Sequence, residues 1–137
     1  MDITQLAAGH QLPKTRLVLD AQAVRSYRDA VGDASPLYGE DPSLVPPMAV
    51  AALSLRHMLR ALTLPPGTVH AGQELSFRQP VAVGQEVVCR AQVSQVGQRK
   101  GWLSLVIEFQ VDAQQPQAHT PALAGRIILF ISLRSSP

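Results

Sequence analysis

Alternation of apolar and polar side chains is clearest in the second half of the chain. From 101 to 111, every second residue is apolar and the polar residues project to the opposite side, with Val106 as the exception. A repeat of two residues over this length predicts a half-buried β-strand. Alternation also predicts a strand at 74–78, and a less regular pattern predicts one at 85–96. A nearly continuous run of β-formers predicts a last strand at 122–133, covered on both faces.

Turn-forming residues connect these strands. The segment 96–101 carries glycine near both ends and charge at its tip, which predicts a hairpin between the strands on either side. The segment 112–121 is polar and rich in glutamine, so a loop is expected before the last strand.

The first half of the chain contains a long apolar segment at 46–64. Two prolines open this segment, where they suit the first turn of a helix, and Pro-Pro-Gly at 65–67 ends it. Residues 48–53 are apolar on all sides, which predicts a helix covered by protein almost all round. A narrow polar strip near the end of the helix is expected to meet solvent; it consists of Ser54, Arg56, His57 and Arg60.

A shorter helix is predicted at 21–31, after a short strand at 15–20. Asp20 is placed to cap the start of this helix, and Gly32 ends it. Apolar residues recur there at helical spacing, and Arg25, Arg28 and Asp29 are expected to face outward. The turn-rich segment 33–42 predicts a loop.

These elements predict the fold class α+β. Long antiparallel strands with one apolar face need cover, and 46–64 is the one segment apolar enough to supply it. A curved antiparallel sheet wrapped around one central helix follows. The chain has 137 residues, so we expect a single domain spanning 1–137.

The composition of the chain narrows the classes of partner that we expect. Apolar residues make up 46% of the chain, which argues against disorder, and a net charge of +2 without a basic block argues against nucleic acid. Prolines, arginines and short length exclude the 46–64 helix as a membrane span, so no membrane partner is expected. One cysteine, Cys89, fits a reducing compartment as a small apolar strand residue. No signal segment is visible, and we expect a cytoplasmic protein.

Motifs for metal, phosphate or nucleophilic chemistry are absent from the sequence. No histidine pair or cysteine cluster has metal-ligand spacing, so no metal site is expected. Neither a glycine-rich phosphate loop nor a nucleophile elbow is present.

Three stretches resemble the MaoC-like hydratases and dehydratases. Residues 27–38 resemble the entry to their hydratase motif, and Val-Pro-Pro-Met at 45–48 resembles the start of the central helix in the N-terminal, dehydratase-like branch. Residues 69–86 resemble the strand and turn that follow. The similarity runs through nearly the whole chain from about Asp20. It implies the hotdog fold, in which a curved antiparallel sheet wraps around a central helix.

The resemblance implies reversible hydration of a trans-2-enoyl thioester to an (R)-3-hydroxyacyl thioester. The substrate would be a thioester of coenzyme A or acyl carrier protein, and no cofactor is needed. Active members carry the pattern Gly-Asp-x-Asn-Pro-Leu/Ile-His, whose Asp and His do the acid–base chemistry. In this chain four positions match the pattern and two differ: Gly32, Asp33, Pro36 and Leu37 match, Ser35 replaces Asn, and Tyr38 stands at the His position.

Four residues are therefore candidates for the site. Asp33 and Tyr38 are the catalytic candidates; the alternatives are a turn-forming acid and a packed aromatic with a bonded hydroxyl. In the family, an amide at the start of the central helix is thought to polarise the thioester carbonyl. Pro46 and Pro47 lack a backbone amide hydrogen, whereas Met48 retains one, so Met48 is a substrate-binding candidate. His70 begins a strand right after the helix, close enough to approach a cleft, and is the second substrate-binding candidate; the alternative is a surface or structural residue.

Three functions stay open on the sequence. A hydratase or dehydratase requires Tyr38, His70 or a partner chain to replace the missing histidine. The alternative is a non-catalytic acyl-binding subunit that pairs with a catalytic hotdog chain, and a thioesterase is also compatible with the fold. We expect a dimer, either a homodimer or a heterodimer with another hotdog chain, joined edge to edge. The run 122–133 and Val106 offer apolar surface for that contact.

Overall fold

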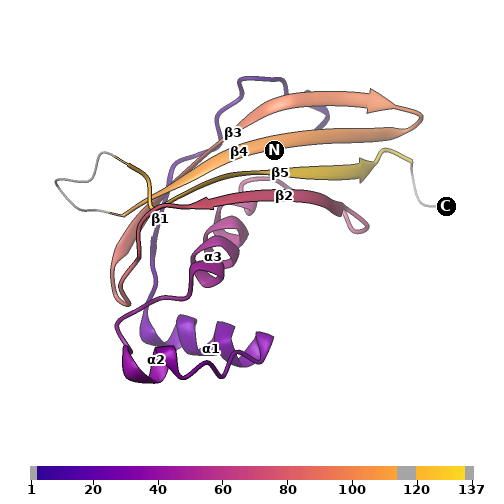
Figure 1. The fold of residues 1–137 in the computed structure, drawn as a ribbon. Coiled ribbons are helices and arrows are strands. Elements are labelled where there is room, and N and C mark those ends of the chain that lie inside the picture. Colours follow the sequence, from indigo (N-terminus) through magenta and orange to yellow (C-terminus); the bar gives the residue numbers. More distant parts are fainter. Residues whose placement is uncertain (1–2, 114–119, 135–137) are drawn as a thin grey trace.

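The computed structural model describes residues 3–113 and 120–134. Within these ranges the chain forms one five-stranded antiparallel sheet with strand order β1-β3-β4-β5-β2. Figure 1 shows α3 beneath the curved sheet, and α1 and α2 farther from it. The strands are β1 (Thr15–Val18), β2 (Val69–Phe77), β3 (Glu86–Arg99), β4 (Trp102–Ala113) and β5 (Leu123–Ser132). The helices are α1 (Ala21–Val31), α2 (Leu37–Glu40), α3 (Pro47–Leu59) and a short 3-10 turn (Ile3–Gln5).

The α+β architecture predicted from the sequence is confirmed. Local capping explains why α1 has the predicted bounds. The Asp20 carboxylate accepts a hydrogen bond of 2.8 Å from the Ala23 N–H, which satisfies one of the free donors of the first turn. Gly32 ends the helix in the left-handed conformation, with φ of 70°, and glycine adopts this conformation without steric cost.

The central helix α3 differs from its prediction in three ways. It ends at Leu59 rather than at 64. Ser54, expected to meet solvent, is 0% exposed, because it lies on the side that packs against β1 and β3, with its hydroxyl beside the Cys89 thiol. Cover is also incomplete at the start of the helix: Met48 is 46% exposed and Ala52 is exposed as well. The sheet covers one side of α3, and this chain leaves part of the opposite side open.

The β3–β4 hairpin turns at Lys100 and Gly101. Both residues have positive φ, 52° and 81°, as a two-residue hairpin turn of the I′ kind requires. The strands therefore run farther into the predicted 96–101 segment than expected. Residues 33–42 contain the short helix α2 in addition to turns, and most of the predicted loop 112–121 lies outside the described residues.

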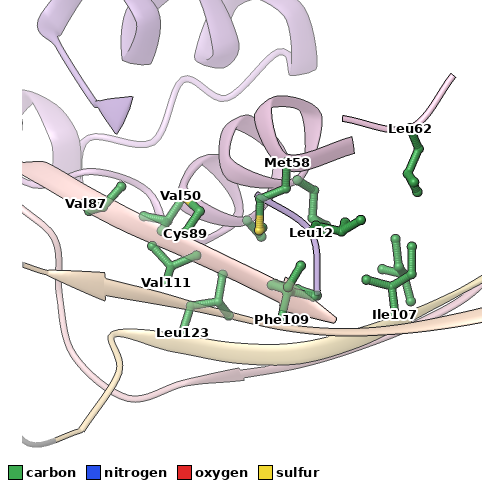
Figure 2. Packing of buried hydrophobic residues seen from close by; sticks show 14 of the residues in the cluster. Leu12, Val50, Met58, Leu62, Val87, Cys89, Ile107, Phe109, Val111 and Leu123 are labelled. Atoms are coloured by element: carbon green, nitrogen blue, oxygen red, sulfur yellow. The ribbon is translucent and has the colours of Figure 1, made fainter. Parts of the chain in front are cut away.

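Buried apolar side chains from α3 and the sheet form the core (Figure 2). Val50 and Met58 project from α3 toward Val111, Phe109 and Leu123 on the sheet. Burying each such side chain contributes roughly 1.5–3 kcal/mol. This contact fixes the position of the helix, and therefore of its N-terminal turn, against the sheet.

Two strands form the edges of the sheet, β1 and β2. The run 122–133, which we expected to supply an edge contact, forms β5 and lies between β4 and β2. The backbone of β5 is therefore already paired on both sides, and β2 takes the open edge. In the ranges that the structure describes, no helix combines the length and apolar character that crossing a membrane requires.

Candidate functional site

A cavity of about 400 Å³ opens where α2, the first turn of α3 and the ends of β2 and β5 meet. Apolar side chains dominate its walls, and Tyr38, Arg78 and Gln79 supply polar groups. The apolar part of the lining comprises Leu37, Leu44, Val45, Pro47, Val50, Phe77, Pro80, Val81 and Ala122. An apolar cavity with a few polar groups is typical of a small-molecule site.

Tyr38, the residue at the histidine position of the motif, lines this cavity. The Arg28 guanidinium lies 4.8 Å from the centroid of the Tyr38 ring, within the range of a cation–π contact. We expected Arg28 to face outward, and that expectation is wrong: Arg28 is half-buried because it packs against the motif that follows α1. The contact holds one face of the Tyr38 ring.

Asp33 forms the turn between α1 and Tyr38. Its N–H donates to the Arg28 carbonyl at 2.8 Å, and its carboxylate accepts from the Ser35 N–H at 3.0 Å. The Ser35 carbonyl in turn accepts from the Arg28 guanidinium at 3.3 Å. Asp33 is not among the residues that line the cavity. The structure thus brings Asp33 and Tyr38 into one connected unit, but only Tyr38 reaches the cavity.

Met48 lies at the second position of α3, and its side chain is outside the cavity lining. Among the described residues we find no hydrogen-bond partner for its N–H. A free donor is expected in the first turn of a helix, and Pro47 beside it lines the cavity. The backbone of Met48 therefore remains a candidate donor near the cavity, in contrast to its side chain.

His70 lies far from Tyr38 within the chain. It is exposed near the first residue of β2, whereas the cavity includes Phe77 at the other end of the same strand. Seven residues of β-strand span roughly 23 Å at about 3.3 Å per residue. The structure does not bring His70 to the cavity of its own chain.

A larger trough of about 770 Å³ lies on the outer face of the sheet. Its walls mix polar and apolar side chains and carry both signs of charge, including the Glu74–Arg126 pair at 2.9 Å. None of the four predicted site residues lines it. We therefore place the site in the smaller cavity, where the motif and the helix N-terminus meet. Among the described residues no group of three or more potential ligands could hold a metal ion.

Burial raises the pKa of the Cys89 thiol, and the hydroxyls of Ser54 and Thr15 beside it offset part of this effect. Cys89 lies on β3, fully buried. A raised pKa keeps the thiol protonated and therefore unreactive at neutral pH. The prediction that Cys89 is a small apolar strand residue is confirmed.

The sequence pattern matches that of a known protein family. A family model described as "FAS1-like, dehydratase domain region" matches residues 7–117. No curated protein sequence matches the chain.

Solved structures with the same fold cover nearly the whole chain. The MaoC-like dehydratase from Rhodospirillum rubrum is 19% identical with a TM-score of 0.75, and 99% of each chain is covered. The (R)-hydratase from A. caviae is 23% identical with a TM-score of 0.70, covering 91% of this chain and 96% of its own. One chain of the HadBC 3R-hydroxyacyl-ACP dehydratase complex from Mycobacterium tuberculosis is 17% identical with a TM-score of 0.68, covering 95% and 98%. This chain therefore has the hotdog fold.

Proposed function

The chain belongs to the FAS1-like dehydratase domain family, and on that premise we propose that it catalyses reversible hydration of a trans-2-enoyl thioester in the Tyr38 cavity. The product would be an (R)-3-hydroxyacyl thioester, by analogy with the (R)-hydratase and the 3R-hydroxyacyl-ACP dehydratase of the same fold. The analogy extends to substrate class alone. The carrier would be coenzyme A or acyl carrier protein.

One observation carries the proposal: the motif residue Tyr38 and the N-terminal turn of α3 line the same apolar cavity. An enoyl chain needs an apolar enclosure, and its reacting carbons need a proton donor or acceptor within hydrogen-bond reach. A tyrosine hydroxyl both donates and accepts hydrogen bonds. The cavity therefore offers the enclosure and one acid–base group together.

In the hydration direction, water adds its oxygen to C3 of the enoyl group and a proton arrives at C2. We assign Tyr38 to the delivery of the proton at C2, because a tyrosine hydroxyl carries a proton that it can donate. The free N–H of Met48 is the candidate donor to the thioester carbonyl, whose oxygen gains negative charge as C3 is attacked.

We assign Asp33 a positioning role in place of direct contact with the substrate. Its carboxylate holds the Ser35 N–H, and the Ser35 carbonyl holds Arg28, which in turn packs on the Tyr38 ring. Loss of the Asp33 acceptor would loosen the turn from which Tyr38 enters the cavity.

The test is a hydration assay on the purified full chain with crotonyl-coenzyme A, followed by the loss of enoyl-thioester absorbance. Turnover above buffer that falls on Tyr38→Phe supports the proposal. A wild-type rate equal to that of buffer would overturn it for the homomeric protein.

A second candidate function is an acyl-binding subunit without chemistry of its own. Two observations favour it: Tyr38 occupies the histidine position, and solved structures of the same fold include two-subunit complexes, ChsH1-ChsH2 and HadBC. This function predicts binding of an acyl thioester without turnover, and activity only when a hotdog chain with an intact Asp and His is added.

A further inference from the structure

The edge strand β2 is long and open. Within the described residues it pairs with β5 alone, and most of its nine residues are exposed. β1, at the opposite edge, has four residues. A long open edge with exposed backbone groups is a template for pairing with another strand. An antiparallel edge can pair with its own copy around a two-fold axis, because the strand then meets itself in the opposite direction.

His70 faces the same side of the sheet as the cavity. It pairs with Leu129 on β5, and Leu129 is buried on the α3 side of the sheet, with 2% exposed. Directly paired residues on neighbouring strands project to the same face. The imidazole is therefore on the α3 side, but at the wrong end of β2 to reach the cavity of its own chain.

We propose that the chain forms a two-fold dimer through β2 and that the partner's His70 completes the Tyr38 cavity as its general base. With an axis at Glu74 and the one-residue shift at the bulge between His70 and Gly72, the partner's His70 lies opposite Phe77. Phe77 pairs with the buried Leu123 and therefore faces the α3 side, as His70 does. Phe77 and Arg78 both line the cavity.

Side chains on β2 favour a second copy of this chain as the occupant of the edge. Phe77 is 43% exposed and Val69 is 47% exposed, at the two ends of the strand, and a two-fold axis brings each end against the other end of the partner. The two Glu74 carboxylates that approach each other near the axis are each paired with Arg126, at 2.9 Å between Nε and Oε2. The charges at the axis are thus already neutralised within each chain.

The chemistry rests on the proposed hydratase function. The imidazole of the partner's His70 takes a proton from water as the water oxygen bonds to C3. Tyr38 gives its hydroxyl proton to C2 and regains one from the imidazolium. One water is consumed, no electrons are gained or lost, and both side chains return to their starting states. An imidazole is the usual general base in such reactions. Tyr38 acts as the proton donor and does not fill this role.

Cross-linking tests the proposed pairing of the two β2 strands independently of enzymatic activity. In the full chain, a double variant that combines His70→Cys with Phe77→Cys is treated with a short bismaleimide and separated under denaturing conditions. We expect a covalent dimer, because the thiol introduced at position 70 of each chain would lie beside the thiol introduced at position 77 of the other. The two single variants are the matched controls and should stay monomeric, because equivalent residues lie roughly 23 Å apart across the axis. A monomeric double variant, or single variants that cross-link equally well, would overturn the proposed pairing.

Complementation tests the catalytic role. His70→Gln and Tyr38→Phe are each expected to lower kcat by about 100-fold or more. After the two variants are unfolded and refolded together, half of the dimers carry one chain of each kind. Every such dimer has one intact site, so the mixture should regain about a quarter of the wild-type rate. If both residues served the same chain's site, no activity would return.

The outcomes separate the two proposals. Wild-type turnover with no recovery in the mixture, or with an undiminished rate in His70→Gln, rejects the partner's His70 and retains the hydratase function. A wild-type protein without turnover rejects the hydratase function and the catalytic role of His70 with it. The cross-linking result then still decides whether the partner's His70 lies at the cavity.

Discussion

The guanidinium of Arg28 on α1 lies over the ring of Tyr38 on α2, 4.8 Å from its centroid. The two residues are separated by the Asp33 turn, and the same guanidinium donates to the Ser35 carbonyl within that turn. One cation therefore joins the end of α1, the turn and the aromatic ring that lines the cavity. The contact packs the guanidinium against one face of the Tyr38 ring.

Replacing Arg28 with methionine should loosen this unit. The variant keeps an apolar stem but loses the hydrogen bond to Ser35 and the cation–π contact, so we expect the free energy of unfolding to fall by about 1 kcal/mol. The hydration rate should fall with it. Urea unfolding and the crotonyl-coenzyme A assay measure the two effects. The matched control is Arg25→Met on the exposed side of α1, which should change stability by less than about 0.5 kcal/mol. Equal effects of the two substitutions would contradict the role of Arg28.

Asp33 can be tested by a pair of substitutions. Asp33→Asn keeps an oxygen that accepts the Ser35 N–H, so the variant should retain most of the wild-type rate. Asp33→Ala removes the acceptor, and its stability should fall by about 0.5–1.5 kcal/mol, with a lower rate. Kinetics and urea unfolding of both variants decide the matter. An asparagine variant as inactive as the alanine variant would show that the charge itself is needed and would return Asp33 to a direct catalytic role.

Gly125 on β5 allows the edge strand β2 to approach closely. It pairs with Leu75 on β2, and a Cβ added at this position would overlap the Glu74 carbonyl oxygen and lie 3.0 Å from Cζ of Phe109. We expect Gly125→Ala to lower the free energy of unfolding by about 1–3 kcal/mol. Gly97→Ala is the control, since its Cβ would meet the rotatable Ser104 hydroxyl alone. Similar thermal unfolding temperatures for the two variants would refute this explanation.

The buried thiol of Cys89 should make stability fall at high pH. Burial raises its pKa above the ordinary value of 9.0, so the folded state holds the proton more tightly than the unfolded state does. Its contribution to stability is full below the unfolded pKa and is lost as the pH rises through the folded pKa. Urea unfolding of wild type and Cys89→Ala from pH 7 to 10 should show a steeper decline for the wild type. Parallel curves would indicate that the folded thiol titrates normally.

Local chemistry made much of the fold predictable. The cap at Asp20 and the stop at Gly32 act within one turn of α1, so the bounds of that helix follow from neighbouring residues. The alternation at 101–111 reflects one buried face of β4 and is visible without any tertiary information. Alternation predicted only the second half of β2, and the first half was expected as strand through the resemblance at 69–86, because an edge strand exposed on both faces has no alternating pattern to detect.

The site was less predictable because its parts meet through tertiary contacts. Ser54 is polar in sequence but fully buried, because a small hydroxyl fits where α3 packs on the sheet. Arg28 has the pattern of an exposed helix residue, and its contact with Tyr38 depends on the course of the intervening turn. Tyr38 was identified through its place in a motif, whereas the cavity around it combines segments from α2 to β5.

The most direct test of the account is the rate of crotonyl-coenzyme A hydration by the purified wild-type chain and by Tyr38→Phe. The substitution keeps the ring on Arg28 and removes only the hydroxyl. We predict turnover by the wild type and a kcat lower by about 100-fold or more in the variant, with unchanged unfolding by urea. No turnover by the wild type, or equal rates for the two proteins, would contradict the assignment of this chemistry to the Tyr38 cavity.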